Sequence, residues 1–178
     1  MVEFDVLIEN ASIIDGTGKK EYKGSIGVKA DKVVAVGDVK GDAIRTIDAK
    51  SLKALPGFID AHSHAERMLL FYPLAQSHIM QGITTFVGGQ CGGSPAPIAE
   101  KMGLPGLLSD YMMEFAPYKY RPETRKFPFE QVNEWMKEKF GWTIDYRTMG
   151  EFFETVEAKR VSINYAPLVG HGSIRSAV

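Results

Sequence analysis

The stretch Leu55-Pro56-Gly57-Phe58-Ile59-Asp60-Ala61-His62-Ser63-His64 decides how the rest of this 178-residue chain is interpreted. A Pro-Gly turn precedes a short apolar run, which predicts a β-strand that ends in two histidines. Side chains at i and i+2 of a strand point to the same side, so we expect His62 and His64 to present their imidazoles together, with Asp60 on the same face. Such a pair is typical of half a divalent-metal site, although a short match of this kind also arises by chance.

The composition is that of an ordinary soluble globular protein, with 44% hydrophobic and 24% charged residues. The net charge of -1 favours neither nucleic acid nor an anionic membrane surface as a partner. Cys91 is the one cysteine, so there is no intrachain disulfide, which fits a cytoplasmic setting. The sequence shows neither a signal peptide nor an apolar run close to the ~20 residues that span a bilayer.

The first 55 residues show no helical period and predict a small β-rich unit. Short runs rich in Val and Ile are separated by Gly and Asp, and Ala30-Asp31 forms the connection of a hairpin. The expected strands cover residues 4–10, 12–15, 24–29, 32–37 and 44–49.

Residues 56 to 98 predict a strand–helix–strand unit. After the histidine strand, Glu66–Gln81 is expected to be a helix that Pro73 kinks or delays and that Gly82 ends. Ile83–Gly89 is then a β-branched strand. Two parallel neighbours end at the same edge of a sheet, which is where α/β barrels build their sites.

The second strand runs into a glycine-rich stretch that contains Cys91. No Gly-Lys-Ser/Thr follows it, so it is not a phosphate loop. A free cysteine is usually a small buried hydrophobe, but the edge argument brings Cys91 beside two histidines and favours a metal ligand. His78 lies within the expected helix, where we predict a structural or solvent-exposed role.

The last part of the chain predicts two helices and a third parallel strand. One helix covers Phe129–Phe140, and a second begins at Thr148, which has capping-box spacing with Glu151. The strand Val161–Val169 leads to His171, which should face the same edge of the sheet or serve a structural role. Residues 102–120, rich in Met and aromatics, are expected to form a packed loop over that edge.

Several of these segments resemble a known family. The stretch from Pro56 to His64 looks like the opening of the amidohydrolase superfamily, the metal-dependent (β/α)8-barrel hydrolases. The segments 82–92, 142–152 and 164–175 are similar to the N-acyl-D-amino-acid deacylases, or D-aminoacylases, and the resemblance covers nearly the whole chain. Two positions depart from the pattern of that branch: Gln90 stands where Asn usually precedes the cysteine, and Glu66 stands where an Asp often follows the second histidine.

The resemblance implies an α/β fold in which residues 1–55 contribute to an N-terminal β-sandwich. Residues 56–178 would form roughly the first three strands of a TIM barrel, which remains incomplete. It also implies a zinc centre of one or two ions. The implied ligands are His62, His64 and Cys91, with Asp60 and His171 contacting the ligands or the substrate.

The implied activity is metal-dependent hydrolysis of a linear amide, an N-acyl-D-amino acid, to a carboxylate and a free D-amino acid. A complete barrel needs ~250 residues, so we expect the chain to be an N-terminal fragment, the product of a truncated reading frame or half of a split enzyme. Alone it should be inactive, and its open sheet edge should make it prone to form homo-oligomers. The general base is expected beyond Val178, in the remainder of the barrel or in a partner chain, and no catalytic residue is assigned here. Cyclic-amide hydrolases such as hydantoinases and dihydroorotases, a non-catalytic subunit and a degenerate fragment without function remain alternatives.

Overall fold

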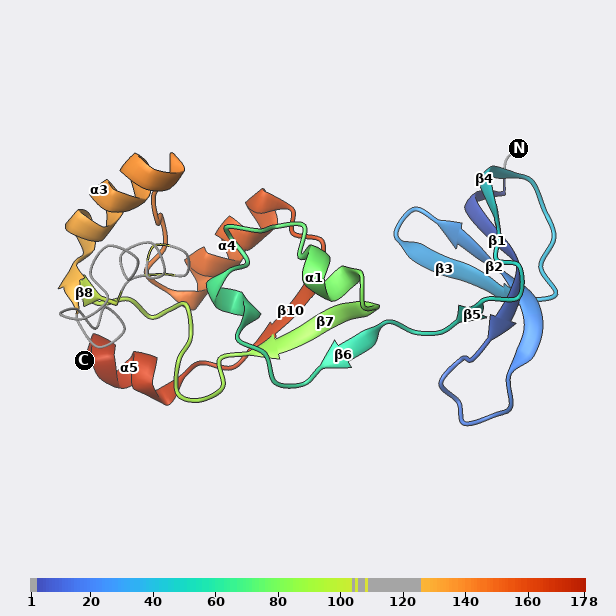
Figure 1. The fold of residues 1–178 in the computed structure, drawn as a ribbon, viewed down its shortest axis with the longest axis horizontal. Helices are drawn as coiled ribbons and strands as arrows, with labels where there is room; N and C mark the ends of the chain where they lie inside the picture. The colour runs from blue at the N-terminus through green and yellow to red at the C-terminus, as the bar shows by residue number, and fades with distance from the viewer. Residues whose placement is uncertain (1–2, 104, 106–107, 109–125) are drawn as a thin grey trace. The chain divides into compact units, whose positions relative to one another are not determined.

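The computed structural model describes residues 3–103, 105, 108 and 126–178. The chain divides into two compact units, Met1–Pro56 and Gly57–Val178, which are described separately (Figure 1). None of the helices formed by the described residues is long and apolar enough to cross a membrane.

The first unit is a five-stranded sheet in the order β3-β2-β1-β4, with β5 paired to β1. β1 runs antiparallel to β2 and parallel to β4 and β5, while β2 and β3 form the expected hairpin. The bounds are β1 (Phe4–Ile13), β2 (Tyr22–Lys29), β3 (Lys32–Gly37), β4 (Ala43–Asp48) and β5 (Lys53–Ala54).

Strand β1 supplies the buried side chains of this unit, Phe4, Leu7, Ala11 and Ile13. The sequence predicted two separate strands here, and that prediction is wrong. β1 continues through a bulge between Ile8 and Ala11, because Asn10 adopts a left-handed backbone that absorbs the extra residue without ending the pairing.

The second unit contains three parallel strands in the order β10-β7-β6, as the sequence predicted. They are β6 (Phe58–Asp60), β7 (Ile83–Gly88) and β10 (Asn164–Pro167). A short antiparallel pair joins β8 (Lys101–Met102) to β9 (Phe127–Pro128). The helices are η1 (Ala65–Arg67, a 3-10 turn), α1 (Gln76–Ile79), α3 (Phe129–Phe140), α4 (Met149–Lys159) and α5 (His171–Ala177).

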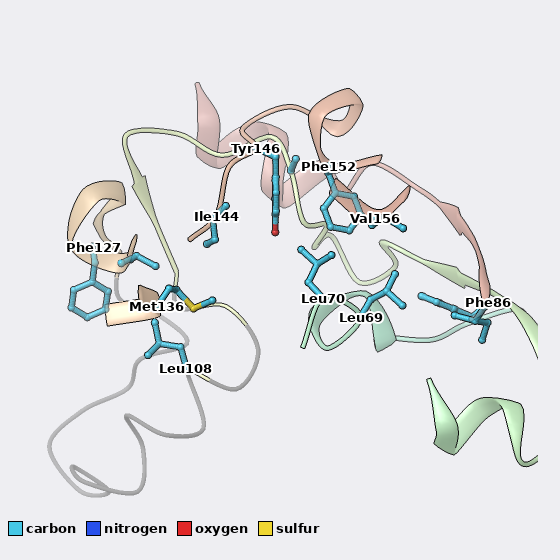
Figure 2. Close-up of a cluster of buried hydrophobic side chains, with 13 residues drawn as sticks. Leu69, Leu70, Phe86, Leu108, Phe127, Met136, Ile144, Tyr146, Phe152 and Val156 are labelled. Atoms are coloured by element: carbon cyan, nitrogen blue, oxygen red, sulfur yellow. The ribbon is translucent and has the colours of Figure 1, made fainter. Parts of the chain in front are cut away.

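The core of this unit lies between the sheet and its helices (Figure 2). Phe86 of β7 stacks on Tyr165 of β10 with ring centroids 4.7 Å apart. Phe152 of α4 meets the same tyrosine edge to face at 6.1 Å, so α4 covers this side of the sheet. On the other side of the sheet, Ile59 and Ala166 are exposed.

The predicted helix over Glu66–Gln81 is wrong, because the structure has only the turn η1 and the four-residue α1 there. Pro73 cannot donate a backbone hydrogen bond and would collide with the preceding turn. Ala75, the residue before α1, adopts a left-handed conformation with φ of +43°, so α1 is a separate helix after the proline.

Helices α3 and α4 confirm the sequence predictions. α3 follows Pro128 and ends at Gly141, whose φ of +74° is the left-handed cap that glycine favours. α4 begins with the full capping box between Thr148 and Glu151. Of the loop predicted over 102–120, residues 104, 106–107 and 109–120 lie outside the described residues.

Candidate metal centre

The two histidines follow the end of β6 and do not lie within a strand. A side-chain oxygen of Asp60 accepts a hydrogen bond from the backbone N–H of His62 at 3.1 Å, and this turn ends the strand. The predicted reason for the pairing, strand alternation, is therefore wrong. The pairing itself is present, because the His62 and His64 rings lie edge to face with centroids 5.6 Å apart.

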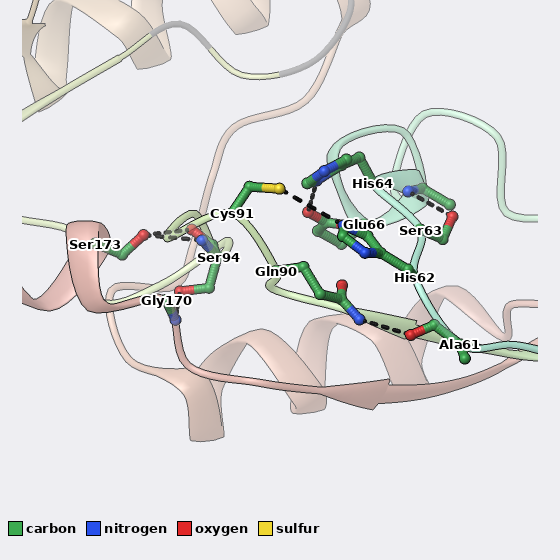
Figure 3. A network of polar contacts seen from close by, with 11 residues as sticks. Ala61, His62, Ser63, His64, Glu66, Gln90, Cys91, Ser94, Gly170 and Ser173 are labelled. Atoms are coloured by element: carbon green, nitrogen blue, oxygen red, sulfur yellow. Dashed lines mark hydrogen bonds and ion pairs between the residues drawn. The ribbon is translucent and has the colours of Figure 1, made fainter.

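Two hydrogen bonds hold this histidine segment against the neighbouring strand β7 and the loop that follows it. The N–H of Ser63 donates to the carbonyl of Val87 at 2.9 Å, which continues the pairing beyond β6. The Gln90 side-chain amide donates to the carbonyl of Ala61 at 2.9 Å (Figure 3). The residue before the cysteine therefore ties the histidine segment to the loop that carries Cys91.

Cys91 lies beside the histidines at the carboxyl end of β7, as the edge argument predicted. Its Sγ is 3.5 Å from Nε2 of His62, and the ligand atoms of His62, His64 and Cys91 all lie within 4.8 Å of one another. All three residues are exposed, so the cysteine is not a buried hydrophobe.

The separation of two of the donor atoms, and the chemistry of all three, suit a zinc ion. Around tetrahedral zinc, with bonds of about 2.0 to 2.3 Å, two ligand atoms lie about 3.3 to 3.8 Å apart. The 3.5 Å separation of Sγ and Nε2 falls in this range. Two imidazoles and a thiolate are the ligand types that zinc prefers, and three protein ligands leave a fourth position open.

The backbone of the loop after β7 determines where Cys91 points. Cys91 has a φ of +56°, an uncommon conformation for a residue with a side chain. Gly89 has a φ of +85°, and a Cβ on it would collide with the backbone carbonyl of Leu168. The loop can therefore pass the end of β10 only with glycine at this position.

A network of hydrogen bonds ties the same loop to the start of α5 (Figure 3). The N–H of Ser94 donates to Oγ of Ser173 at 2.9 Å, and that hydroxyl donates to the carbonyl of Ser94 at 3.1 Å. The N–H of Gly170 donates to Oγ of Ser94 at 3.0 Å. The carboxyl ends of β7 and β10 are joined in this way, and the position of Cys91 depends on both.

The other expected site residues lie outside this three-residue cluster. His171 is the exposed first residue of α5 and is not among the clustered donors. Asp60 is partly buried and contacts the backbone of His62. His78 is half-buried with its ring 5.8 Å from that of Phe86, which agrees with the structural role predicted for it.

Comparison with known proteins gives a consistent result along nearly the whole chain. D-aminoacylase of Alcaligenes xylosoxydans xylosoxydans is 30% identical over 176 residues, and N-acyl-D-aspartate deacylase of the same organism is 34% identical over 175 residues. Each alignment covers 98% of this chain and 30 to 31% of the relative. The chain is similar to the D-aminoacylase branch of the amidohydrolases over nearly its whole length. It spans about 30% of the length of these relatives.

Solved structures of this branch agree. A crystal structure of D-aminoacylase superposes with a TM-score of 0.71 at 29% identity, covering 98% of this chain and 31% of that one. N-acyl-D-glutamate deacylase of Bordetella bronchiseptica, in a complex with zinc and a phosphonate inhibitor, superposes with a TM-score of 0.67 at 28% identity, with the same coverage. No family model matches the chain.

One further residue of the chain lies close to the candidate metal centre. Glu66 is buried, with 2% of its side chain exposed, and its Oε1 lies 3.5 Å from Nδ1 of His64 (Figure 3). The sequence marked Glu66 as a departure from the family pattern but gave no sign that it is buried. The one hint of a role at the centre was its position, two residues after the candidate ligand His64.

A cavity of about 660 Å³ begins at His64. Its walls carry the aromatic side chain of Trp142 and three cations, Arg67, Lys101 and Lys126. Within the described part of the chain, Arg67 and Lys101 have no acidic partner, while Lys126 donates to the backbone carbonyl of Ser176 at 3.2 Å. The volume is that of a small-molecule site, and its charge suits an anionic ligand.

Proposed function

We propose that this chain provides the metal-binding part of an N-acyl-D-amino-acid deacylase, which hydrolyses a linear amide to a carboxylate and a free D-amino acid. One observation carries the proposal: the donor atoms of His62, His64 and Cys91 lie within 4.8 Å of one another. The three residues come from two different loops, in a chain that is similar to deacylases over 98% of its length. A chance His-x-His sequence does not account for a thiol held beside the pair.

His62, His64 and Cys91 are the proposed ligands, and zinc is the proposed metal, because a thiolate is a soft ligand that disfavours magnesium and calcium. Bound zinc polarises the scissile carbonyl and lowers the pKa of a bound water toward ~7. The chain's own contribution is to hold three donor atoms within 4.8 Å of one another. Asp60 orients the segment through the backbone of His62, and His171 is proposed as a contact to substrate or ligand.

The cavity beside His64 is the proposed substrate site. An N-acyl amino acid carries one carboxylate and an apolar acyl group. Arg67 and Lys101 offer cations without acidic partners, and Trp142 offers an apolar wall. A substrate carboxylate near the cations would direct its amide toward the candidate metal position, since His64 borders the same cavity.

The remaining catalytic parts are proposed to lie outside this chain. The relatives are about three times as long as the aligned region, and the three parallel strands leave Ile59 and Ala166 exposed on one face of the sheet. We propose that this face is the interior of a (β/α)8 barrel completed by further strands, which also supply the general base. Residues 1–55 are proposed to form part of a β-sandwich.

The test is release of free D-amino acid from N-acetyl-D-methionine, N-acetyl-D-aspartate and N-acetyl-D-glutamate. The protein is assayed as its organism makes it, loaded with zinc, beside the 178-residue chain alone. We expect the 178-residue chain alone to be inactive and the D-enantiomers to be hydrolysed by any form that includes the remaining strands. Ring opening of hydantoins without deacylation, or equal hydrolysis of the L-enantiomers, would overturn the proposal.

A Cys91→Ser variant tests the ligand assignment in the same protein. Removing one of three ligands should weaken zinc binding by more than the 10- to 100-fold typical of losing an outer partner, with a parallel loss of activity. Competition with a chromophoric chelator measures the zinc dissociation constant. Unchanged zinc binding in this variant would show that Cys91 is not a ligand.

A further inference from the structure

Glu66 is a buried carboxyl group whose surroundings do not satisfy it. Its side chain is 2% exposed, and its Oε2 has no hydrogen-bond partner among the residues that the structure describes. A buried carboxylate is costly unless a charge or donor lies beside it. The burial of Glu66 therefore indicates that a specific charged or hydrogen-bonding partner stabilises its carboxyl group.

The nearest such partner is the ring of His64. The 3-10 turn η1 folds the chain back after His64, so that Oε1 of Glu66 lies 3.5 Å from Nδ1 of the imidazole. This is an ion-pair distance, longer than a hydrogen bond of normal length. Since Nδ1 faces the buried carboxyl group, Nε2 is the nitrogen left to face the metal position.

The turn that brings the two residues together is itself held in place. The N–H of Ala65 donates to Oγ of Ser63 at 3.2 Å, and Ser63 is bonded through its own N–H to Val87 of β7. Glu66 is thus fixed relative to the sheet by contacts that do not involve either histidine ring.

The far side of Glu66 is closed by β7 and β10. A Cβ placed on Gly88 would lie 2.7 Å from Oε2 of Glu66 and 2.9 Å from the ring of Tyr165, so only glycine leaves room for the carboxyl group. Burial raises the pKa of Tyr165 above its ordinary value, and the Glu66 charge raises it further. The tyrosine therefore stays protonated and cannot add a second negative charge beside Glu66.

We propose that Glu66 is a positioning residue that holds the His64 ring with Nδ1 turned inward and Nε2 turned toward the metal. The inference rests on the zinc centre of the proposed function. Ligand histidines commonly donate their second ring N–H to a carboxylate, which fixes the tautomer and raises the basicity of the ligand nitrogen. The three-residue cluster is the proposed metal site, and Glu66 orients one of its proposed ligands.

The test compares Glu66→Gln, which keeps the size of the side chain and removes the carboxylate, with Glu154→Gln, an exposed glutamate on α4. Zinc affinity is measured by chelator competition, and the unfolding of the metal-free proteins by urea titration. We expect Glu66→Gln to weaken zinc binding about 10- to 100-fold without lowering metal-free stability, and Glu154→Gln to change neither. Unchanged zinc affinity, or a loss of zinc affinity matched by a loss of metal-free stability, would overturn the inference.

A second measurement needs no variant. Nitrogen-15 NMR of the wild-type histidine rings reports which nitrogen of His64 carries the proton, and the inference predicts Nδ1 both with and without zinc. A proton on Nε2 in the metal-free protein would contradict it. If wild-type protein binds no zinc at all, the proposed function fails; if it binds zinc and Glu66→Gln binds equally well, only the positioning role fails.

Discussion

The candidate centre has a histidine side, His62 and His64, and a cysteine side, Cys91. Different kinds of contact hold the two sides in place. His62 and His64 are exposed side chains on a segment that pairs with β7, and His64 lies against the buried Glu66. Cys91 is held in a different way. It is presented by a left-handed backbone in a loop that glycine and serine contacts join to the end of β10.

This difference indicates that a side-chain contact orients the candidate ligand His64, whereas the backbone orients the candidate ligand Cys91. An imidazole has two nitrogens, so its aim depends on what the second nitrogen contacts. A thiol has one donor atom, so its aim depends on the backbone that carries it. Substitutions in the loop should therefore affect the cysteine side through the fold, whereas Glu66 should affect the histidine side with the fold intact.

Gly89→Ala should have the largest effect on the fold. The left-handed backbone alone costs an alanine about 1 to 2 kcal/mol, and the collision with the carbonyl of Leu168 adds to it. Urea unfolding of the metal-free protein measures the loss, and zinc affinity should fall with it. Gly103→Ala is the control, because a Cβ there meets nothing within 4 Å among the residues that the structure describes. Equal stability of the two variants would show that the loop does not depend on this close approach.

Ser173→Ala should have a smaller effect on the same side. It removes the hydroxyl that bonds both the N–H and the carbonyl of Ser94, at a net cost of about 1 kcal/mol. Zinc affinity should fall less than in Cys91→Ser, because the loop loosens while all three ligands remain. Ser162→Ala, at an exposed residue, is the control. A loss of zinc affinity as large as that of Cys91→Ser would mean that Ser173 acts on the metal directly.

Glu151→Gln lies on neither the histidine side nor the cysteine side of the candidate centre, and it should have the smallest effect on stability and zinc affinity. Backbone N–H groups of Arg147 and Thr148 bond the Glu151 carboxylate at 2.8 and 2.9 Å and hold its pKa below the ordinary value. A lowered pKa means that the stabilisation is present above the ordinary value and is lost as the pH falls through the lowered one. The stability difference from wild type should be full near neutral pH and vanish in strong acid. The zinc affinity of the variant at neutral pH should equal that of wild type. A pH-independent difference would refute the carboxylate's part in the cap.

The sequence predicted the elements that local signals specify. The capping box at Thr148 and Glu151, and the Pro128 and Gly141 that bound α3, are contained in a few neighbouring residues. The parallel strands were predicted from the strand–helix–strand order of the segments. By contrast, the helix predicted over Glu66–Gln81 is absent, because Pro73 separates the turn η1 from the short helix α1.

The candidate site was also predicted only in part, because some of its features depend on contacts that the local sequence does not specify. The edge argument brought Cys91 to the histidines, since parallel strands share an edge whatever their loops do. It could not show that β6 stops at Asp60, because that depends on one side-chain contact. It also could not show that Glu66 is buried, which depends on strands β7 and β10 far along the chain.

X-ray absorption spectroscopy of the zinc-loaded protein tests the central claim most directly, because it reports the atoms bound to the metal. A centre built from His62, His64 and Cys91 predicts one sulfur neighbour at about 2.3 Å, together with nitrogen neighbours at about 2.0 to 2.1 Å. The sulfur signal should disappear in Cys91→Ser. A bound zinc ion surrounded by nitrogen and oxygen alone in the wild-type protein would contradict the account.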